Sequence, residues 1–168
     1  MMTMLKTHKL LRILGFMSLF LLVFAFFVLD PFFGYQMCSL CLAQRVVLTC
    51  VGVLLVWSSF CAQASMLNHV LNLLVVLLGI IGVGLSVWHL MLQYVYSNAS
   101  CPLLLSRHPS WWWSMFLSRY HWTPCQFERA ALLGMPLSAL AGLFFVVVTF
   151  TVIGLWYHEK LVNQLPSE

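Results

Sequence analysis

Charged side chains are scarce in this sequence. The 168 residues include eight Lys or Arg and four Asp or Glu, so that 7% of the chain is charged, whereas soluble domains carry about 25%. So few charges cannot cover the surface of a water-soluble protein of this size, and soluble enzyme folds are therefore excluded. The net charge of +4 is small and scattered, so we expect no nucleic-acid partner.

Charge is absent altogether from three long stretches. No Asp, Glu, Lys or Arg occurs in residues 13–29, 46–106 or 130–158. Uncharged apolar runs of about 18 residues or more are typical of membrane-spanning helices, each of which needs about 20 residues. The sequence therefore predicts an all-α membrane protein. We expect one domain over residues 1–168, a four-transmembrane-helix bundle with spans at about 10–29, 42–61, 69–92 and 131–157 and outer loops at about 30–41 and 93–130.

The N-terminal span follows a basic segment that contains Lys6, Lys9 and Arg12. A secretory signal peptide is the alternative for such a segment. The apolar run is longer than a usual signal core, and proline at position 31 ends it where a cleavage site would be expected. We therefore expect an uncleaved span. Short basic flanks stay inside, which favours a cytoplasmic N-terminus, although the basic residues divide equally between the two expected sides.

The second outer loop is the only sizeable extramembrane segment that we expect. It is rich in aromatic residues, which gather at membrane–water interfaces; those of its central part are Trp111, Trp112, Trp113, Tyr120 and Trp122. Together with neighbouring arginines they suit a short interfacial helix lying on the bilayer surface. A buried lid is the alternative.

The six cysteines divide into two groups. Cys50 and Cys61 fall in the second span, where we expect buried cysteine to behave as a small hydrophobe. The others fall in the two outer loops: Cys38, Cys41, Cys101 and Cys125. Because four spans bring both loops to one side of the membrane, two pairs in one outer compartment suggest two disulfides.

The outer cysteines allow three interpretations. Static disulfides would staple the loops, but a bridge across Cys38-Ser-Leu-Cys41 closes almost no loop and adds little stability. A zinc site would use Cys-x-x-Cys as one half, but Cys101 and Cys125 lack the spacing of the other half, and we predict no metal. Redox chemistry is favoured, because a helix N-terminus stabilises a thiolate.

Two further residues fall near the Cys-x-x-Cys segment. Arg45 lies four residues after Cys41, on the same helix face and about 6 Å along the axis. Its alternatives are snorkelling to the headgroups or providing a fixed positive charge for a thiolate and an anionic ligand. His89 ends the third span at a similar depth, either as an interfacial hydrogen-bonding residue or as part of a ligand site. A cleft at that depth opens to lipid and suits a hydrophobic cofactor.

These residues belong to a wider pattern. Its elements are Cys38-Ser-Leu-Cys41 followed by Arg45, His89-Leu-Met-Leu-Gln93, the Cys101 and Cys125 pair, and Leu133-Gly134-Met135-Pro136. Together they resemble the DsbB family, bacterial inner-membrane proteins that reoxidise a periplasmic dithiol oxidase, DsbA, with quinone. The resemblance covers most of the chain.

The resemblance implies two disulfides, Cys38–Cys41 and Cys101–Cys125, and an order of thiol–disulfide exchange. The thiolate of a periplasmic DsbA-like oxidase of thioredoxin fold would attack Cys101 and release Cys125. Cys125 would then attack the inner disulfide at Cys38 and free Cys41. All four cysteines are therefore the expected catalytic residues.

The resemblance also implies a cofactor and a location. Cys41 would pass electrons to ubiquinone or menaquinone from the membrane pool, with Arg45 stabilising negative charge and His89 close to the ring. The protein would lie among the lipids of the bacterial inner membrane, with both termini cytoplasmic and the redox loops periplasmic.

Two other functions compete with this one. In the vitamin K epoxide reductase type, which also uses quinone, the loop pair precedes the Cys-x-x-Cys pair, whereas here Cys38 and Cys41 come first. The non-enzyme alternative is a four-span structural or interaction protein with static outer-loop disulfides. Quinone would not change the thiols of such a protein.

Overall fold

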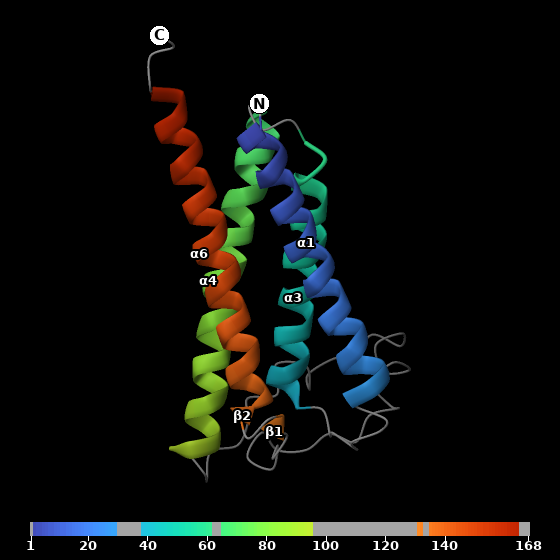
Figure 1. The fold of residues 1–168 in the computed structure, drawn as a ribbon. Coiled ribbons are helices and arrows are strands. Elements are labelled where there is room, and N and C mark those ends of the chain that lie inside the picture. The colour runs from blue at the N-terminus through green and yellow to red at the C-terminus, as the bar shows by residue number, and fades with distance from the viewer. Residues whose placement is uncertain (1, 30–37, 62–64, 96–130, 133–134, 165–168) are drawn as a thin grey trace.

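Four long helices run alternately up and down in the computed structural model (Figure 1). The described residues are 2–29, 38–61, 65–95, 131–132 and 135–164. Within them the elements are α1 (Met2–Phe24), the π-helical turn η1 (Ala25–Leu29), α3 (Ser39–Ser58), α4 (Met66–Tyr94), the strands β1 (Ala131–Leu132) and β2 (Met135–Pro136), and α6 (Leu137–Gln164). Figure 1 shows both termini at one end of the bundle and the start of α3 at the other.

Each long helix contains a segment that is long and apolar enough to cross a membrane. These segments are His8–Val28, Leu40–Ser58, Met66–Tyr94 and Leu137–His158. The predicted all-α bundle of four membrane-spanning helices is confirmed. Among the described residues, two short antiparallel strands, β1 and β2, pair before α6.

The last helix begins six residues after the start of the span expected from the sequence. β1 and β2 occupy that stretch, with Ala131 opposite Pro136 and Leu132 opposite Met135. A proline disfavours helical geometry in the residue before it, so Met135 stays extended and α6 begins at Leu137. The start of this span was predicted from apolar residues alone, and apolarity does not show that a proline keeps the residue before it out of a helix.

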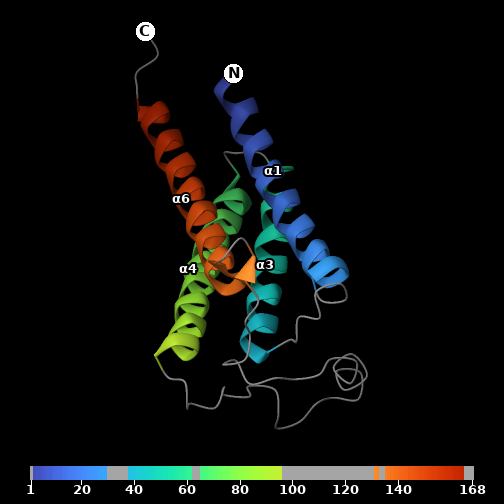
Figure 2. The same cartoon turned by 60° about the horizontal axis from the view of Figure 1, so that its bottom comes forward.

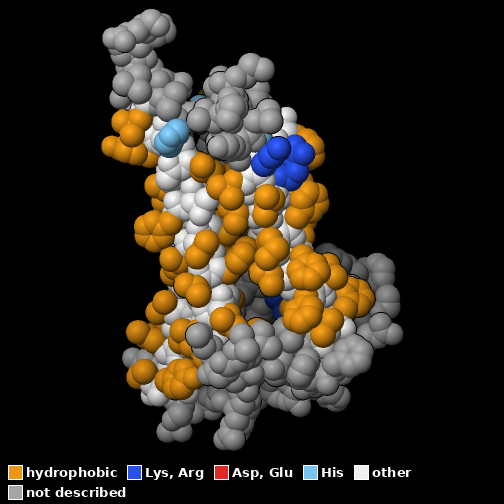
Figure 3. Space-filling model, viewed as in Figure 1, with side chains coloured by type: hydrophobic (Ala, Val, Ile, Leu, Met, Phe, Trp, Pro, Cys, Tyr) orange, Lys and Arg blue, Asp and Glu red, His pale blue; other side chains and the backbone are white. Residues whose placement is uncertain are grey.

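The bundle buries polar side chains and exposes apolar ones. Phe20, Phe27 and Phe150 are 62%, 72% and 71% exposed, and hydrophobic side chains cover the flank of the molecule in Figure 3. The buried polar residues are Ser18, Gln44, Ser58, Ser59, Asn68, Ser86, His89, Ser138 and Thr149. Polar groups within a bilayer must find partners inside the protein, so this distribution is the one expected for a bundle surrounded by lipid.

The helices pack in the order α1, α3, α4, α6. Each touches the next extensively, whereas α1 and α6 touch each other only slightly (Figures 1 and 2). The hydrophobic core therefore runs along α3, α4 and α6, where Val51, Leu55, Val75, Phe145 and Val148 are all buried. The side between α1 and α6 is left less filled, and the cavity described below lies there.

Small residues let α4 and α6 approach closely. A Cβ atom added at Gly82 would lie 2.6 Å from the ring of Phe145, and one added at Gly142 would lie 2.9 Å from the Cβ of Ser86. Gly79 similarly faces Thr149. The hydrophobic effect does not drive helices together inside a membrane, so helix association there depends on van der Waals contact. Small residues increase that contact because they let the helix backbones approach closely.

We expect Gly82→Leu to destabilise the bundle far more than Gly84→Leu. Both changes remove a glycine from α4 and give the same gain in helix propensity, but Gly84 has nothing within 4 Å of an added Cβ. Overpacking against Phe145 costs about 1–3 kcal/mol. Thermal unfolding of the two variants in the same detergent measures the difference, and equal midpoints would contradict the close α4–α6 contact.

Candidate functional site

The N-terminus of α3 holds the Cys-x-x-Cys pair. Cys38 is the N-cap residue, with extended backbone (φ −100°, ψ 164°), and its sulfur accepts a hydrogen bond from the backbone N–H of Cys41 at 3.3 Å. The two Sγ atoms lie 3.0 Å apart, and both residues are thiols in this structure. Both are also buried. The sulfurs are therefore within reach of each other and at the positive end of the helix dipole.

His89 of α4 contacts both sulfurs. Its Nε2 lies 3.6 Å from Cys38 Sγ, and its Nδ1 lies 4.0 Å from Cys41 Sγ. The imidazole is fully buried. The ring therefore sits against the thiol pair, where either ring nitrogen faces a sulfur.

Gln93 and Ser138 hold the other side of this histidine. The amide nitrogen of Gln93, one turn further along α4, lies 3.3 Å from Nε2 of His89. The hydroxyl of Ser138, at the start of α6, donates to the amide oxygen of Gln93 at 3.4 Å. The contacts thus run from α3 through α4 to α6 and fix the orientation of the imidazole.

A second polar side chain, Gln44, crosses from α3 to α4. It is buried, and its amide nitrogen donates to the Ser86 hydroxyl at 3.1 Å. That hydroxyl donates in turn to the backbone carbonyl of Gly82 at 2.9 Å. The contact with Ser86 therefore holds Gln44 in place about one turn after Cys41 along α3.

A cavity of about 180 Å³ that opens to the outside lies over this part of α3. The walls come from α1, η1, α3 and α6 and are mostly apolar. The lining residues are Leu21, Phe24, Ala25, Cys41, Gln44, Arg45, Leu48, Leu137, Ser138, Leu140, Ala141, Phe144 and Phe145.

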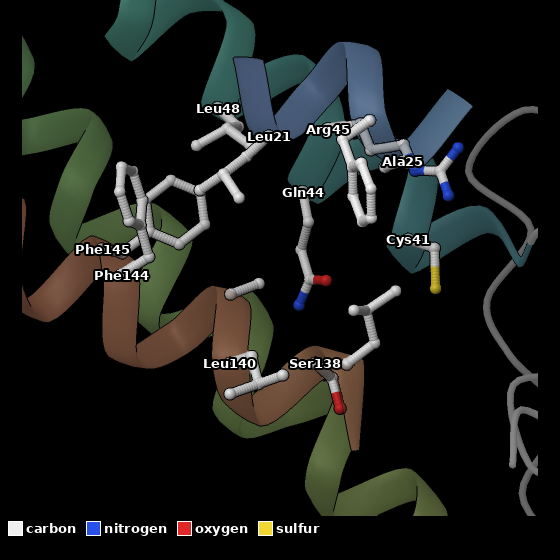
Figure 4. A pocket seen from close by; sticks show the side chains of 13 residues that line it. Leu21, Ala25, Cys41, Gln44, Arg45, Leu48, Ser138, Leu140, Phe144 and Phe145 are labelled. Carbon is white, nitrogen blue, oxygen red and sulfur yellow. The ribbon is translucent and has the colours of Figure 1, made fainter. Parts of the chain in front are cut away.

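The few polar groups of the cavity stand at one end of it. In Figure 4 the amide of Gln44 reaches inward from α3, with Cys41 and Ser138 nearby and the guanidinium of Arg45 at the edge. That guanidinium stacks over the ring of Phe26, 4.6 Å from its centroid. Figure 3 shows a hollow in the same face of the molecule with part of a basic side chain inside it. The cavity therefore combines an apolar body with a cation, an amide and a thiol.

Comparison with known proteins decides the family. A family model described as disulfide bond formation protein DsbB matches residues 7–155, which is most of the chain. The chain belongs to the DsbB family. Searches of the curated proteins and of the solved structures gave no match. As a DsbB-family member the protein is a membrane oxidoreductase of disulfide bond formation.

The DsbB-family chain brings four of the predicted site residues to one end of the bundle. Cys38, Cys41 and His89 form one cluster, and Arg45 lines the cavity beside them. His89 is absent from the cavity lining, whereas Cys41 belongs both to the cluster and to the lining. The predicted contact of His89 with a quinone ring therefore stays a prediction, as does the Cys38–Cys41 disulfide.

Other predicted features lie elsewhere. Cys101, Cys125 and the tryptophan run of residues 111–113 lie outside the described residues. Cys50 is exposed, so the expectation of a buried position is wrong: it falls on the outward face of α3. Cys61 is half-buried at the opposite end of the bundle from Cys38.

Three site residues were not predicted from the sequence: Gln44, Gln93 and Ser138. Gln44 and Gln93 are uncharged polar residues inside apolar helices, and each lies three or four residues after a predicted site residue. That spacing is the signal that would have found them. Ser138 has no such neighbour in the sequence, and only the packing of α6 brings it to Gln93.

Proposed function

We propose that this DsbB-family chain is a quinone-dependent protein-disulfide oxidoreductase. It reoxidises a periplasmic DsbA-like oxidase of thioredoxin fold and passes the electrons to the quinone pool. One observation carries the proposal: Cys41 belongs to two sites at once. Its sulfur lies within 4.0 Å of Cys38 and His89, and the same residue lines the apolar cavity. A residue in this position connects thiol chemistry with a membrane-soluble oxidant.

The composition of the cavity supports quinone, either ubiquinone or menaquinone, as that oxidant. Its apolar walls from α1 and α6 suit a ring with a lipid-soluble tail, and Arg45, Gln44 and Ser138 supply polar groups for ring oxygens. A bound quinone would accept two electrons and two protons. The cavity is lined from both α1 and α6, which touch each other only slightly, so a ligand dissolved in the bilayer would enter between these two helices.

The surroundings of Cys41 favour loss of its thiol proton and stabilise the negative charge of the resulting thiolate. Both thiols stand at the N-terminus of α3, where the helix dipole favours a thiolate. Arg45 adds a fixed positive charge about one turn after Cys41 along α3. Nδ1 of His89, at 4.0 Å from the sulfur, can take the thiol proton in the tautomer that carries its hydrogen on Nε2, with the Gln93 amide turned so that its oxygen accepts that hydrogen. Such contacts are often long in ligand-free proteins and shorten in the reacting complex.

We propose the following exchange. The partner's thiolate attacks Cys101, which forms a mixed disulfide and releases Cys125 as a thiolate. Cys125 attacks Cys38 and releases Cys41. The partner's second thiol resolves the mixed disulfide, and the freed Cys101 then displaces Cys38 and restores the outer disulfide. The partner has lost two electrons, and Cys38 and Cys41 hold them as a dithiol.

The arrangement of the ends supports a location in the bacterial inner membrane. Both termini lie at one end of the bundle and the start of α3, with Cys38 and Cys41, at the other (Figure 1). Basic residues before the first span favour a cytoplasmic N-terminus. The thiol pair would then face the periplasm, where disulfides form and persist.

A coupled assay tests the proposal. Purified protein in detergent, a reduced thioredoxin-fold dithiol oxidase and a soluble ubiquinone analogue are mixed, and quinone absorbance and partner thiols are followed together. We expect one quinone to be consumed for each partner disulfide formed. A four-span protein with static disulfides would consume no quinone, and that result would contradict the proposal.

The order of exchange gives a separate prediction. In the Cys125→Ser variant Cys101 is a thiol, and its thiolate attacks the disulfide of added oxidised partner and releases one partner thiol. Because no Cys125 is present to take Cys101 back into a disulfide, the mixed disulfide between Cys101 and the partner should accumulate. Non-reducing electrophoresis with mass mapping detects that species. Cys50→Ser, which changes an exposed cysteine of α3, is the matched control and should not accumulate it. If Cys125→Ser accumulates no mixed disulfide either, the proposed order is wrong.

A further inference from the structure

Three soft ligand atoms meet at the start of α3. Each of Cys38, Cys41 and His89 offers one atom, and these atoms all lie within 4.8 Å of one another. All three residues are buried, and they come from two helices. Two thiols and an imidazole are the donor set of structural and catalytic zinc sites, and soft sulfur ligands select thiophilic cations.

The distances lie close to those of a tetrahedral site. Zn–S bonds of about 2.3 Å and Zn–N bonds of about 2.0 Å imply ligand separations of roughly 3.8 Å between sulfurs and about 3.5 Å between sulfur and nitrogen. Nδ1 of His89 lies 4.0 Å from Cys41 Sγ, the two sulfurs are 3.0 Å apart, and the three ligand atoms all lie within 4.8 Å of one another. The sulfurs therefore need to separate by under about 1 Å. Cys41 lines the cavity, so its side chain has space to move that way.

The surroundings of His89 suit a metal ligand. A ligating histidine is commonly held through its other ring nitrogen by a hydrogen-bonding partner. With Nδ1 bound to the cation, Nε2 carries the ring hydrogen and needs an acceptor. The amide of Gln93, whose nitrogen lies 3.3 Å from Nε2, supplies that acceptor when it turns its oxygen toward the ring.

We propose that the Cys38–Cys41–His89 cluster binds a thiophilic divalent cation of the Zn²⁺ type in the dithiol state, and that this binding locks the pair in its reduced form. Both thiols lose their protons to the solvent and each forms one bond to the cation, with neutral His89 as third ligand. No electron is transferred. The disulfide form has no thiolate to offer, so oxidised protein does not bind.

This inference goes beyond the proposed function, because binding requires neither quinone nor partner. It predicts that a thiophilic cation acts on the reduced enzyme only. Zn²⁺ added before reoxidation should block the return to the disulfide, and a chelator should release the block. Zn²⁺ is here a reversible ligand of one redox state and not a resident cofactor.

The test uses the full chain in detergent with Cys101→Ser and Cys125→Ser, so that the outer thiols cannot bind. The protein is reduced with a phosphine, freed of reductant and titrated with Zn²⁺ against a chromogenic chelator. We expect one Zn²⁺ per reduced chain and none after oxidation. His89→Ala should weaken binding by at least about 10–100-fold, whereas His69→Ala, at an exposed position of the same helix, should not. Equal binding by oxidised protein, or unchanged affinity in His89→Ala, would overturn the proposal.

Co²⁺ gives a second readout that retains the outer cysteines. The reduced wild-type chain should show a cobalt–thiolate charge-transfer band in the near ultraviolet. The band should be lost in Cys41→Ser and kept in Cys125→Ser. The reverse pattern would assign the metal to the outer pair and overturn the proposal. Neither measurement contains quinone, so a failure here is distinct from a failure of the oxidoreductase proposal.

Discussion

Cys41→Ser is expected to reduce quinone-dependent oxidation of the thioredoxin-fold partner to the uncatalysed background, a loss of about 10³-fold or more. Cys41 is the residue that touches both the thiol cluster and the cavity. Serine cannot form or break a disulfide at this position. The coupled quinone assay measures the loss as a ratio of initial rates.

Two controls separate lost chemistry from lost structure in that experiment. Cys50→Ser makes the same chemical change about two and a half turns further along α3, at an exposed position, and should keep the wild-type rate. Thermal unfolding should show the Cys41→Ser bundle intact, because α4 and α6 keep their contacts. A folded Cys41→Ser variant with the wild-type rate would exclude the proposed electron path.

Arg45→Met is expected to reduce kcat/KM for quinone by about 10²-fold, the usual loss when one fixed stabiliser of developing negative charge is removed. Methionine keeps much of the apolar contact of the side chain with Phe26 and removes the charge. The exchange steps before Cys41 becomes a thiolate do not need that charge. Single-turnover exchange between partner and enzyme without quinone should therefore change much less than turnover.

Arg12 provides a matched control for Arg45. Its guanidinium also stacks on an aromatic ring, 4.8 Å from the centroid of Phe60, but near the opposite end of the bundle, where it lines no part of the cavity. Arg12→Met should leave kcat/KM for quinone unchanged. Equal losses in the two variants would indicate a general effect of charge on the bundle and would contradict the role given to Arg45.

Much of the fold follows from where charge is missing. Apolar length alone predicts four spans, because a bilayer sets the length that each helix needs. Local backbone rules set the ends: Pro136 delays α6, and Cys38 caps α3. Which helix packs on which depends on small contacts such as Gly82 against Phe145. Such contacts join residues far apart in sequence, and apolar length carries no signal of them.

The candidate site was predictable where its members are neighbours along one helix. The spacing of Cys38, Cys41 and Arg45 fixes a common face of α3. The depth of His89 follows from span length, but its direction does not: it faces the sulfurs and not the cavity. Rotation of α4 about its own axis decides this, and it depends on packing across the bundle. For the same reason Ser138 had no signal in the sequence.

In the proposed mechanism Cys38 and Cys41 deliver two electrons directly to quinone. The most direct test is a single turnover, without partner or oxygen, of the chain that carries Cys101→Ser and Cys125→Ser. The dithiol is prepared, reductant is removed, and an equal amount of ubiquinone analogue is added while thiols and quinone absorbance are counted. We predict that one quinone is reduced per chain and that both thiols disappear together into the Cys38–Cys41 disulfide. Persistence of both thiols beside unchanged quinone would contradict the account.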